Sequence, residues 1–118
     1  MPWMPPAAPV LSATEWTIMH VLWKHESILV AGITQELEGA LELTAVTIYL
    51  KRLKSRNYAS SRPDPARLNR DLWRAEVTME QMVTAETELY FSRTLQNQPE
   101  AIRLVRDLAE RRLAGDSR

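Results

Sequence analysis

Eight basic side chains lie close together in the middle of the chain, and side chains of this kind bind phosphate groups. Residues 44–75 carry eight Lys or Arg and two Asp, a local net charge of +6. Residues 1–43 carry one Lys and five Glu, and residues 76–118 carry six Arg and eight acids, so the whole chain is neutral. A local excess of cations in a neutral protein is typical of a single surface that binds nucleic acid. A solvated charged loop is the alternative interpretation.

The start of this basic segment has the pattern of a helix that could read DNA bases. One side of the helix is apolar and contains Val46, Tyr49, Leu50 and Leu53. Short side chains and cations share the other side, which is what a helix in the major groove requires. From this side and from the hairpin that follows, we predict the DNA-binding residues Thr44, Ala45, Thr47, Ile48, Lys51, Arg52, Lys54, Arg56, Arg67, Arg70 and Arg74.

Different roles are expected within this set. The residues assigned to the groove are Thr44, Thr47 and Ile48, and either Ile48 or Ala45 can touch a thymine methyl group. The cations between residues 51 and 56 are assigned to phosphates or guanines.

Two parts of the assignment have structural alternatives. Arg52 could instead pair with a carboxylate of an earlier helix, such as Glu15 or Glu36. The arginines of the hairpin would grip the minor-groove side or the DNA backbone, and a plain solvated hairpin is the alternative for each of them.

The sequence offers little for catalysis or metal binding. It has no cysteine, no glycine-rich phosphate loop and no nucleophile with a neighbouring base. Its two histidines, His20 and His25, do not share a helical face, so we expect no enzyme activity, no cofactor and no metal. The spacing of Trp16, Trp23 and Trp73 favours packing in the core over stacking on bases.

Three short helices should precede the hairpin. Ser12 and Glu15 have the spacing of a capping box, which predicts a helix that continues to about Lys24. A short strand at residues 28–29 and a second helix that ends near Gly39 follow, and Thr44 opens the third helix.

The hairpin itself is expected from two short segments, residues 58–61 and 70–77, around a loop with Pro63 and Pro65. Three helices followed by a hairpin are the element order of a winged helix-turn-helix domain. A mainly α (α+β) fold is therefore predicted.

Two amphipathic helices should complete the chain. Thr78 and Gln81 form another capping box for a long fourth helix that stops near Pro99, and a fifth helix ends before Gly115. A second copy of the chain is the simplest cover for their apolar faces, and folding back onto the first domain is the alternative. The predicted dimerisation residues are Met79, Met82, Val83, Leu89, Tyr90, Leu95, Ile102, Val105, Leu108 and Leu113.

Two stretches of the sequence resemble the penicillinase repressor (BlaI/MecI) family. The first is LSATEWTIMHVLW, residues 11–23, and the second is TAVTIYLKRLKSRNY, residues 44–58. The second stretch departs from the family in having Asn57 where Gly is common, although Asn can also adopt a left-handed conformation. The resemblance implies a winged-helix DNA reader, a helical dimerisation region and repression of resistance or stress genes. It also implies release from DNA through a protease linked to a membrane sensor, for which the sequence does not mark a cleavage site.

The expected organisation has three parts: a flexible proline-rich arm at residues 1–10, a winged-helix DNA-binding domain at 11–77 and a helical dimerisation region at 78–118. We expect a cytoplasmic homodimeric repressor on a (pseudo)palindromic double-stranded DNA operator, since no membrane segment or signal peptide is evident. The alternative is a winged-helix adaptor that binds other proteins and has lost DNA reading, which the outward Ala45 and Ile48 favour.

Overall fold

The computed structural model describes residues 11–115 of the 118-residue chain. The predicted arm, residues 1–10, lies outside the described residues. The described residues form two compact units, residues 11–82 and residues 83–115. Each unit is considered by itself below.

The first helix, α1 (Ala13–Lys24), begins at the predicted capping box. The backbone N–H of Glu15 donates to Ser12 Oγ over 3.2 Å, and the backbone N–H of Ser12 donates to Glu15 Oε1 over 3.2 Å. Two free N–H groups of the first turn are thereby satisfied, and a cap of this kind stabilises a helix by about 1 kcal/mol.

The next two helices are α2 (Val30–Glu36) and α3 (Leu43–Ser55). The chain turns between them through Glu38 and Gly39, whose φ angles are 55° and 74°. α3 begins one residue before the predicted Thr44, and Asn57 just beyond it has a φ of 65°. Asn57 therefore adopts the left-handed conformation for which glycine is commonly used.

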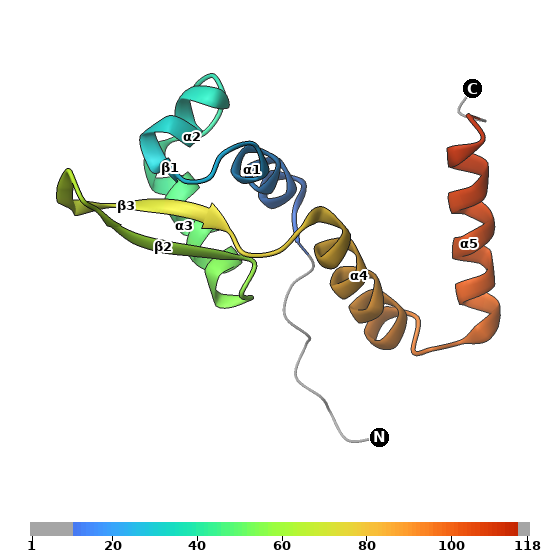
Figure 1. Cartoon of the computed structure of the whole chain (residues 1–118). Coiled ribbons are helices and arrows are strands. Elements are labelled where there is room, and N and C mark those ends of the chain that lie inside the picture. The colour runs from blue at the N-terminus through green and yellow to red at the C-terminus, as the bar shows by residue number, and fades with distance from the viewer. Residues whose placement is uncertain (1–10, 116–118) are drawn as a thin grey trace. The chain divides into compact units, whose positions relative to one another are not determined.

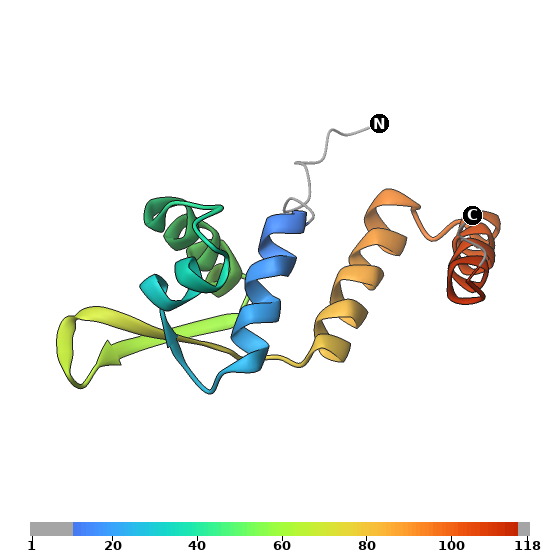
Figure 2. The same ribbon diagram turned by 90° about the horizontal axis from the view of Figure 1, so that it is seen from above.

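Three strands form one antiparallel sheet in the order β1-β3-β2 (Figure 1). They are β1 (Ile28–Leu29), β2 (Ala59–Asp64) and β3 (Arg67–Ala75). The prediction of strands at 58–61 and 70–77 was wrong about their ends. β2 runs through Pro63 because it is an edge strand, where a residue without an N–H group is tolerated. The longer β2–β3 hairpin extends beyond helices α1 to α3 in both ribbon views (Figures 1 and 2).

The core of this unit lies between the three helices and the sheet. Its fully buried side chains come from every helix and include Ile18, Met19, Leu22, Ile33, Val46, Leu50, Leu53 and Met82. Burying each large side chain stabilises the fold by about 1.5–3 kcal/mol. Trp73 of β3 is also buried, as predicted, whereas Trp16 and Trp23 are half-buried and lie near each other, with ring centroids 6.5 Å apart.

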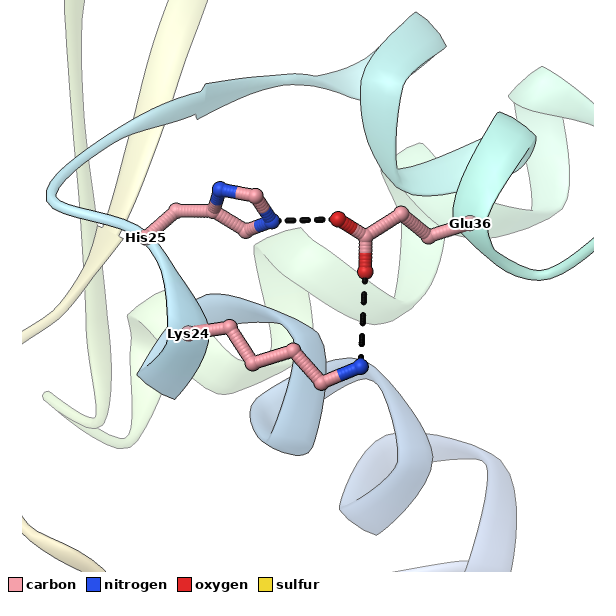
Figure 3. Close-up of polar contacts among 3 residues, drawn as sticks. All are labelled: Lys24, His25 and Glu36. Atoms are coloured by element: carbon pink, nitrogen blue, oxygen red, sulfur yellow. Dashed lines mark hydrogen bonds and ion pairs between the residues drawn. The ribbon is translucent and has the colours of Figure 1, made fainter.

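A cluster of three polar side chains ties the end of α1 to the end of α2 (Figure 3). One carboxylate oxygen of Glu36 accepts a hydrogen bond from His25 Nε2, and the other lies 3.6 Å from Lys24 Nζ. The hydrogen bond from His25 and, to a lesser degree, the charge of Lys24 lower the pKa of Glu36. The cluster therefore favours an ionised Glu36 and connects the end of α1 to the end of α2.

The chain continues into α4 (Met79–Leu89), a π-helical turn (Tyr90–Thr94) and α5 (Pro99–Leu113). The predicted capping box is present: the backbone N–H of Gln81 donates to Thr78 Oγ1 and that of Thr78 to Gln81 Oε1. The predicted long helix is present but ends earlier than expected, because α4 passes directly into the π-helical turn and the helical residues stop at Thr94. Within residues 11–115, no helix is both long and apolar enough to cross a membrane.

The three helices and the antiparallel sheet of residues 11–82 are a winged helix-turn-helix fold, which confirms the predicted fold class. In this fold α2 and α3 form the helix-turn-helix and the β2–β3 hairpin is the wing.

Candidate nucleic-acid interface

The outward face of α3 is held by the burial of its inward face. Val46, Leu50 and Leu53 are fully buried, so the helix cannot rotate without exposing them. Thr44, Ile48 and Lys51 follow one another at intervals of four and three residues and are all exposed. Thr47 and Ala45 are half-buried at the edges of this face. Short side chains thus lie near the start of the helix and cations near its end.

The hydroxyl group of Thr47 is already engaged in a hydrogen bond. It donates to the backbone oxygen of Leu43 over 2.9 Å, so its hydrogen is used within the helix. The oxygen lone pairs and the methyl group remain available. In this rotamer Thr47 can accept a hydrogen bond from adenine N6 or cytosine N4 but cannot donate one to a base.

Arg52 remains near the outward face of α3 instead of pairing with an acid of an earlier helix. Its guanidinium carbon lies 5.4 Å from the centroid of the Tyr49 ring, within the range of a cation–π contact. The two acids considered as alternative partners are engaged elsewhere, Glu15 with Ser12 and Glu36 with His25 and Lys24. The guanidinium therefore stays exposed, beside the exposed Lys51.

Lys54 is engaged within the protein. Its Nζ donates to Ser61 Oγ of β2 over 2.9 Å and lies 5.7 Å from the centroid of the Trp73 ring of β3. These two partners of Lys54 were not expected from the sequence, which predicted a direct contact between Lys54 and DNA. Lys54 connects the end of α3 to both strands of the wing. Arg56, the C-cap residue of α3, is half-buried and also interacts within the chain.

The three predicted arginines of the wing differ in their partners. Arg70 Nε lies 2.8 Å from Asp64 Oδ2, and Arg74 Nε lies 3.1 Å from Glu76 Oε1. Arg67, at the start of β3, is exposed. The carboxylate of Asp64 accepts from the backbone N–H of Ala66 and from Arg70, and these two bonds lower its pKa.

Two exposed leucines at this surface were not predicted as site residues. Leu43, the first residue of α3, is 52% exposed, and Leu68 near the tip of the wing is 77% exposed. Leu43 was missed because the helix was expected to start at Thr44. Leu68 was missed because charge was the signal that selected residues in the hairpin.

The residues predicted for dimerisation fall into three groups by their exposure. Met82 is fully buried in the chain itself, so the expectation that it faces a partner was wrong. Leu95, Ile102 and Val105 are half-buried. The remaining six are exposed, namely Met79, Val83, Leu89, Tyr90, Leu108 and Leu113.

A cavity of about 540 Å³ lies at the base of the wing, beside the end of α1. Its lining includes Trp23 together with Glu26, Arg62, Arg74 and Glu76, so its acidic and basic groups are balanced. Over residues 11–115, no cluster of three His, Asp or Glu side chains is placed to hold a metal ion.

The fold is shared with solved structures of transcriptional regulators. A cysteine-to-serine mutant of MarR from E. coli has a TM-score of 0.56 and 16% identity, over 87% of this chain and 78% of MarR. The same mutant in complex with operator DNA matches equally well, over 87% of this chain and 76% of the other. The PcaV regulator from Streptomyces coelicolor has a TM-score of 0.53 and 14% identity, over 86% of this chain and 76% of PcaV.

The sequence comparison is more specific than the fold comparison. The model of the family described as penicillinase repressor matches residues 11–117, which is nearly the whole chain. A search of curated proteins gives no significant match.

The winged-helix fold of residues 11–82 is the one found in these solved transcriptional regulators. Among such regulators, this chain belongs to the penicillinase repressor family. The family match extends beyond the winged helix and includes α4 and α5.

Proposed function

We propose that this protein represses transcription as a homodimer bound to a (pseudo)palindromic DNA operator, with one α3 helix in each of two major-groove half-sites. The observation that carries the proposal is the division of α3 into two faces. Three fully buried residues fix the helix from behind. Thr44, Ile48 and Lys51 lie on the opposite side, with the half-buried Thr47 and the exposed Arg52 at its edges. Side chains of these kinds contact base edges and phosphates in protein–DNA complexes.

The chemistry of each side chain on α3 determines which part of the DNA it is proposed to contact. Ile48 is 48% exposed and has no polar atom, so its favourable contact in the groove is a thymine methyl group. Thr47 accepts from adenine or cytosine, as its bond to Leu43 dictates. Lys51 and Arg52 lie one turn further along, where they bind phosphates or guanines.

The second unit supports the homodimer. No residue of α5 is buried, yet Leu104 and Leu108 lie one helical turn apart and are 62% and 54% exposed. Apolar residues aligned in this way on one helix require a cover. A second copy buries them against the same residues of the partner, and its two-fold axis presents two α3 helices to an inverted repeat.

Family membership extends the proposal to the biological setting. We include regulation of antibiotic-resistance genes, action in the cytoplasm and release by a sensor-linked protease. Cleavage in the C-terminal helices would separate the two DNA-reading units, and the loss of bivalent binding would lower the affinity by orders of magnitude.

A protein-binding adaptor is the second candidate, and the exposed Leu43 and Ile48 on α3 favour it. Apolar side chains in the centre of a surface are typical of a protein interface. An adaptor would use the same face of α3 without any preference for a DNA sequence.

Selection of binding sites from random double-stranded DNA, with the mass of the purified protein from light scattering, separates the two functions. The repressor is expected to be a dimer that enriches one inverted repeat. A protein that enriches no sequence at any salt concentration would refute DNA reading and support the adaptor.

A further inference from the structure

The tip of the wing carries an enlarged β-bulge. Pro63 pairs with Asp71 and Asp64 pairs with Arg67, so residues 68–70 of β3 have no partner residue on β2. Extra residues in one strand break the alternation of side chains between the two faces and point them in new directions. The bulge therefore places Leu68 outside the regular pattern of the hairpin.

The carboxylate of Asp64 holds this bulge in shape. Asp64 is only 8% exposed, although it lies near the end of the hairpin. Its Oδ1 accepts from the backbone N–H of Ala66 over 3.0 Å, and its Oδ2 accepts from Arg70 Nε over 2.8 Å. One bond fixes the two-residue turn and the other fixes the far end of the bulge, so the segment between them has a defined conformation.

The bulge displays an apolar side chain between two cations. Leu68 is 77% exposed, with Arg67 directly before it and Arg70 two residues after it. The hairpin tip extends beyond the helices of its unit (Figures 1 and 2), so helices α1 to α3 do not cover it. The exposed Arg67 beside Leu68 is attracted by phosphates and by the negative potential of a narrow minor groove, whereas the charge of Arg70 is balanced by Asp64.

We propose that Leu68 enters the minor groove beside each half-site as an apolar wedge, and that Asp64 and Arg70 position it. The isobutyl group of Leu68 makes no favourable contact with a charged phosphate. The sugars that line the minor groove and partly unstacked base steps provide an apolar environment for it. The wedge makes binding sensitive to how easily the contacted step unstacks, so flexible pyrimidine–purine steps are preferred there. This inference rests on the proposed function and adds a determinant of specificity that does not use hydrogen bonds.

The experiment places 2-aminopurine in the flank of a selected operator and follows its fluorescence as protein is added. Unstacking of the probe by the wild-type protein is expected to raise the fluorescence. Leu68→Ala and the polar Leu68→Asn should abolish the rise and weaken binding about tenfold, the size of one lost specific contact. Leu68→Met keeps an apolar side chain of similar volume and should retain both the rise and the affinity.

A double-mutant cycle tests the positioning role of Asp64. Asp64→Asn should weaken binding to the selected site, and adding Leu68→Ala to it should cost little more, because both changes remove the same contact. Additive losses would refute that role.

The possible failures are distinguishable. A selected operator that binds wild-type protein without a rise in fluorescence, or with the same rise for Leu68→Ala, overturns the wedge and leaves DNA reading intact. A wild-type protein that binds no DNA overturns both the wedge and the proposed function.

Discussion

Lys54 Nζ of α3 lies 2.9 Å from Ser61 Oγ of β2, and this bond joins α3 to the wing. The same ammonium group lies 5.7 Å from the centroid of the Trp73 ring, so it contacts both strands of the hairpin. A lysine in the basic segment thus has a structural role that its charge alone did not indicate. Lys54 is therefore expected to position the proposed DNA-binding surface and not to bind DNA itself.

Replacement of Lys54 should therefore differ from replacement of Lys51. Lys54→Met is expected to weaken operator binding without changing the dependence of affinity on salt, because no phosphate contact is lost. Lys51→Met should weaken binding to all DNA and reduce the slope of log affinity against log salt by about 0.9, the value for one phosphate. Equilibrium titrations at several salt concentrations measure both. Equal reductions in slope would show that Lys54 binds phosphate directly.

The proposed base-reading role of Ile48 predicts a change in specificity. Ile48→Ala removes a methyl contact in the major groove and is expected to weaken operator binding by about 1–3 kcal/mol, with little effect on random DNA. The ratio of the two affinities is the measurement. Lys51→Met serves as the control, since it should weaken binding both to the operator and to random DNA. A ratio unchanged by Ile48→Ala would remove Ile48 from the set of base-reading residues.

The burial of the inward face of α3 predicts how much stability is lost when one of its core side chains is shortened. Leu50 is fully buried, so Leu50→Ala should lower the free energy of unfolding by about 2–5 kcal/mol. Urea unfolding followed by circular dichroism tests this value. Lys51→Ala on the adjacent, exposed position is expected to change stability by less than about 0.5 kcal/mol. Equal free energies of unfolding for the two variants would contradict the burial of Leu50 on the inward face of α3.

The exposed leucines of α5 allow a test of the proposed dimer. The double variant Leu104→Glu/Leu108→Glu introduces charges on the apolar face and should be monomeric in light scattering. Arg103→Glu, on the polar side of the same helix, should remain dimeric. A double variant that stays dimeric would exclude this face of α5 as the interface.

The cluster around Glu36 predicts a dependence of stability on pH. Because the folded-state pKa of Glu36 is lowered, its ionised form stabilises the fold at pH values above its ordinary pKa of 4.5. This contribution is lost as the pH falls below 4.5 toward the folded-state pKa. Glu36→Gln should therefore be less stable than wild type at pH 7 and should approach wild type at the lowest pH. A difference in unfolding free energy that is constant with pH would contradict the assignment.

Features that depend on nearby residues could be predicted from the sequence. The capping boxes of Ser12 and Thr78 are present because both partners lie within one helical turn. The inward stripe of α3 follows helical periodicity, and all its members are buried or half-buried. Asn57 has the left-handed conformation that the turn after α3 requires.

Features that depend on tertiary contacts could not be predicted. β2 continues through Pro63 because this strand lies at the edge of the sheet. The partners of Lys54 lie on strands whose register the sequence does not reveal. Met82 has the same apolar character as its exposed neighbour Met79, and only the packing of α4 distinguishes them.

Guanine-N7 methylation protection on the selected operator tests the central claim most directly, because this atom lies in the major groove. Two α3 helices of a dimer should protect guanines in two half-sites, whose centres lie one helical turn of about 10 base pairs apart, or a multiple of it. Lys51→Met should weaken the protection at both half-sites together. Protection of one unpaired patch, or binding with every guanine N7 still reactive, would contradict a dimer that reads DNA through α3.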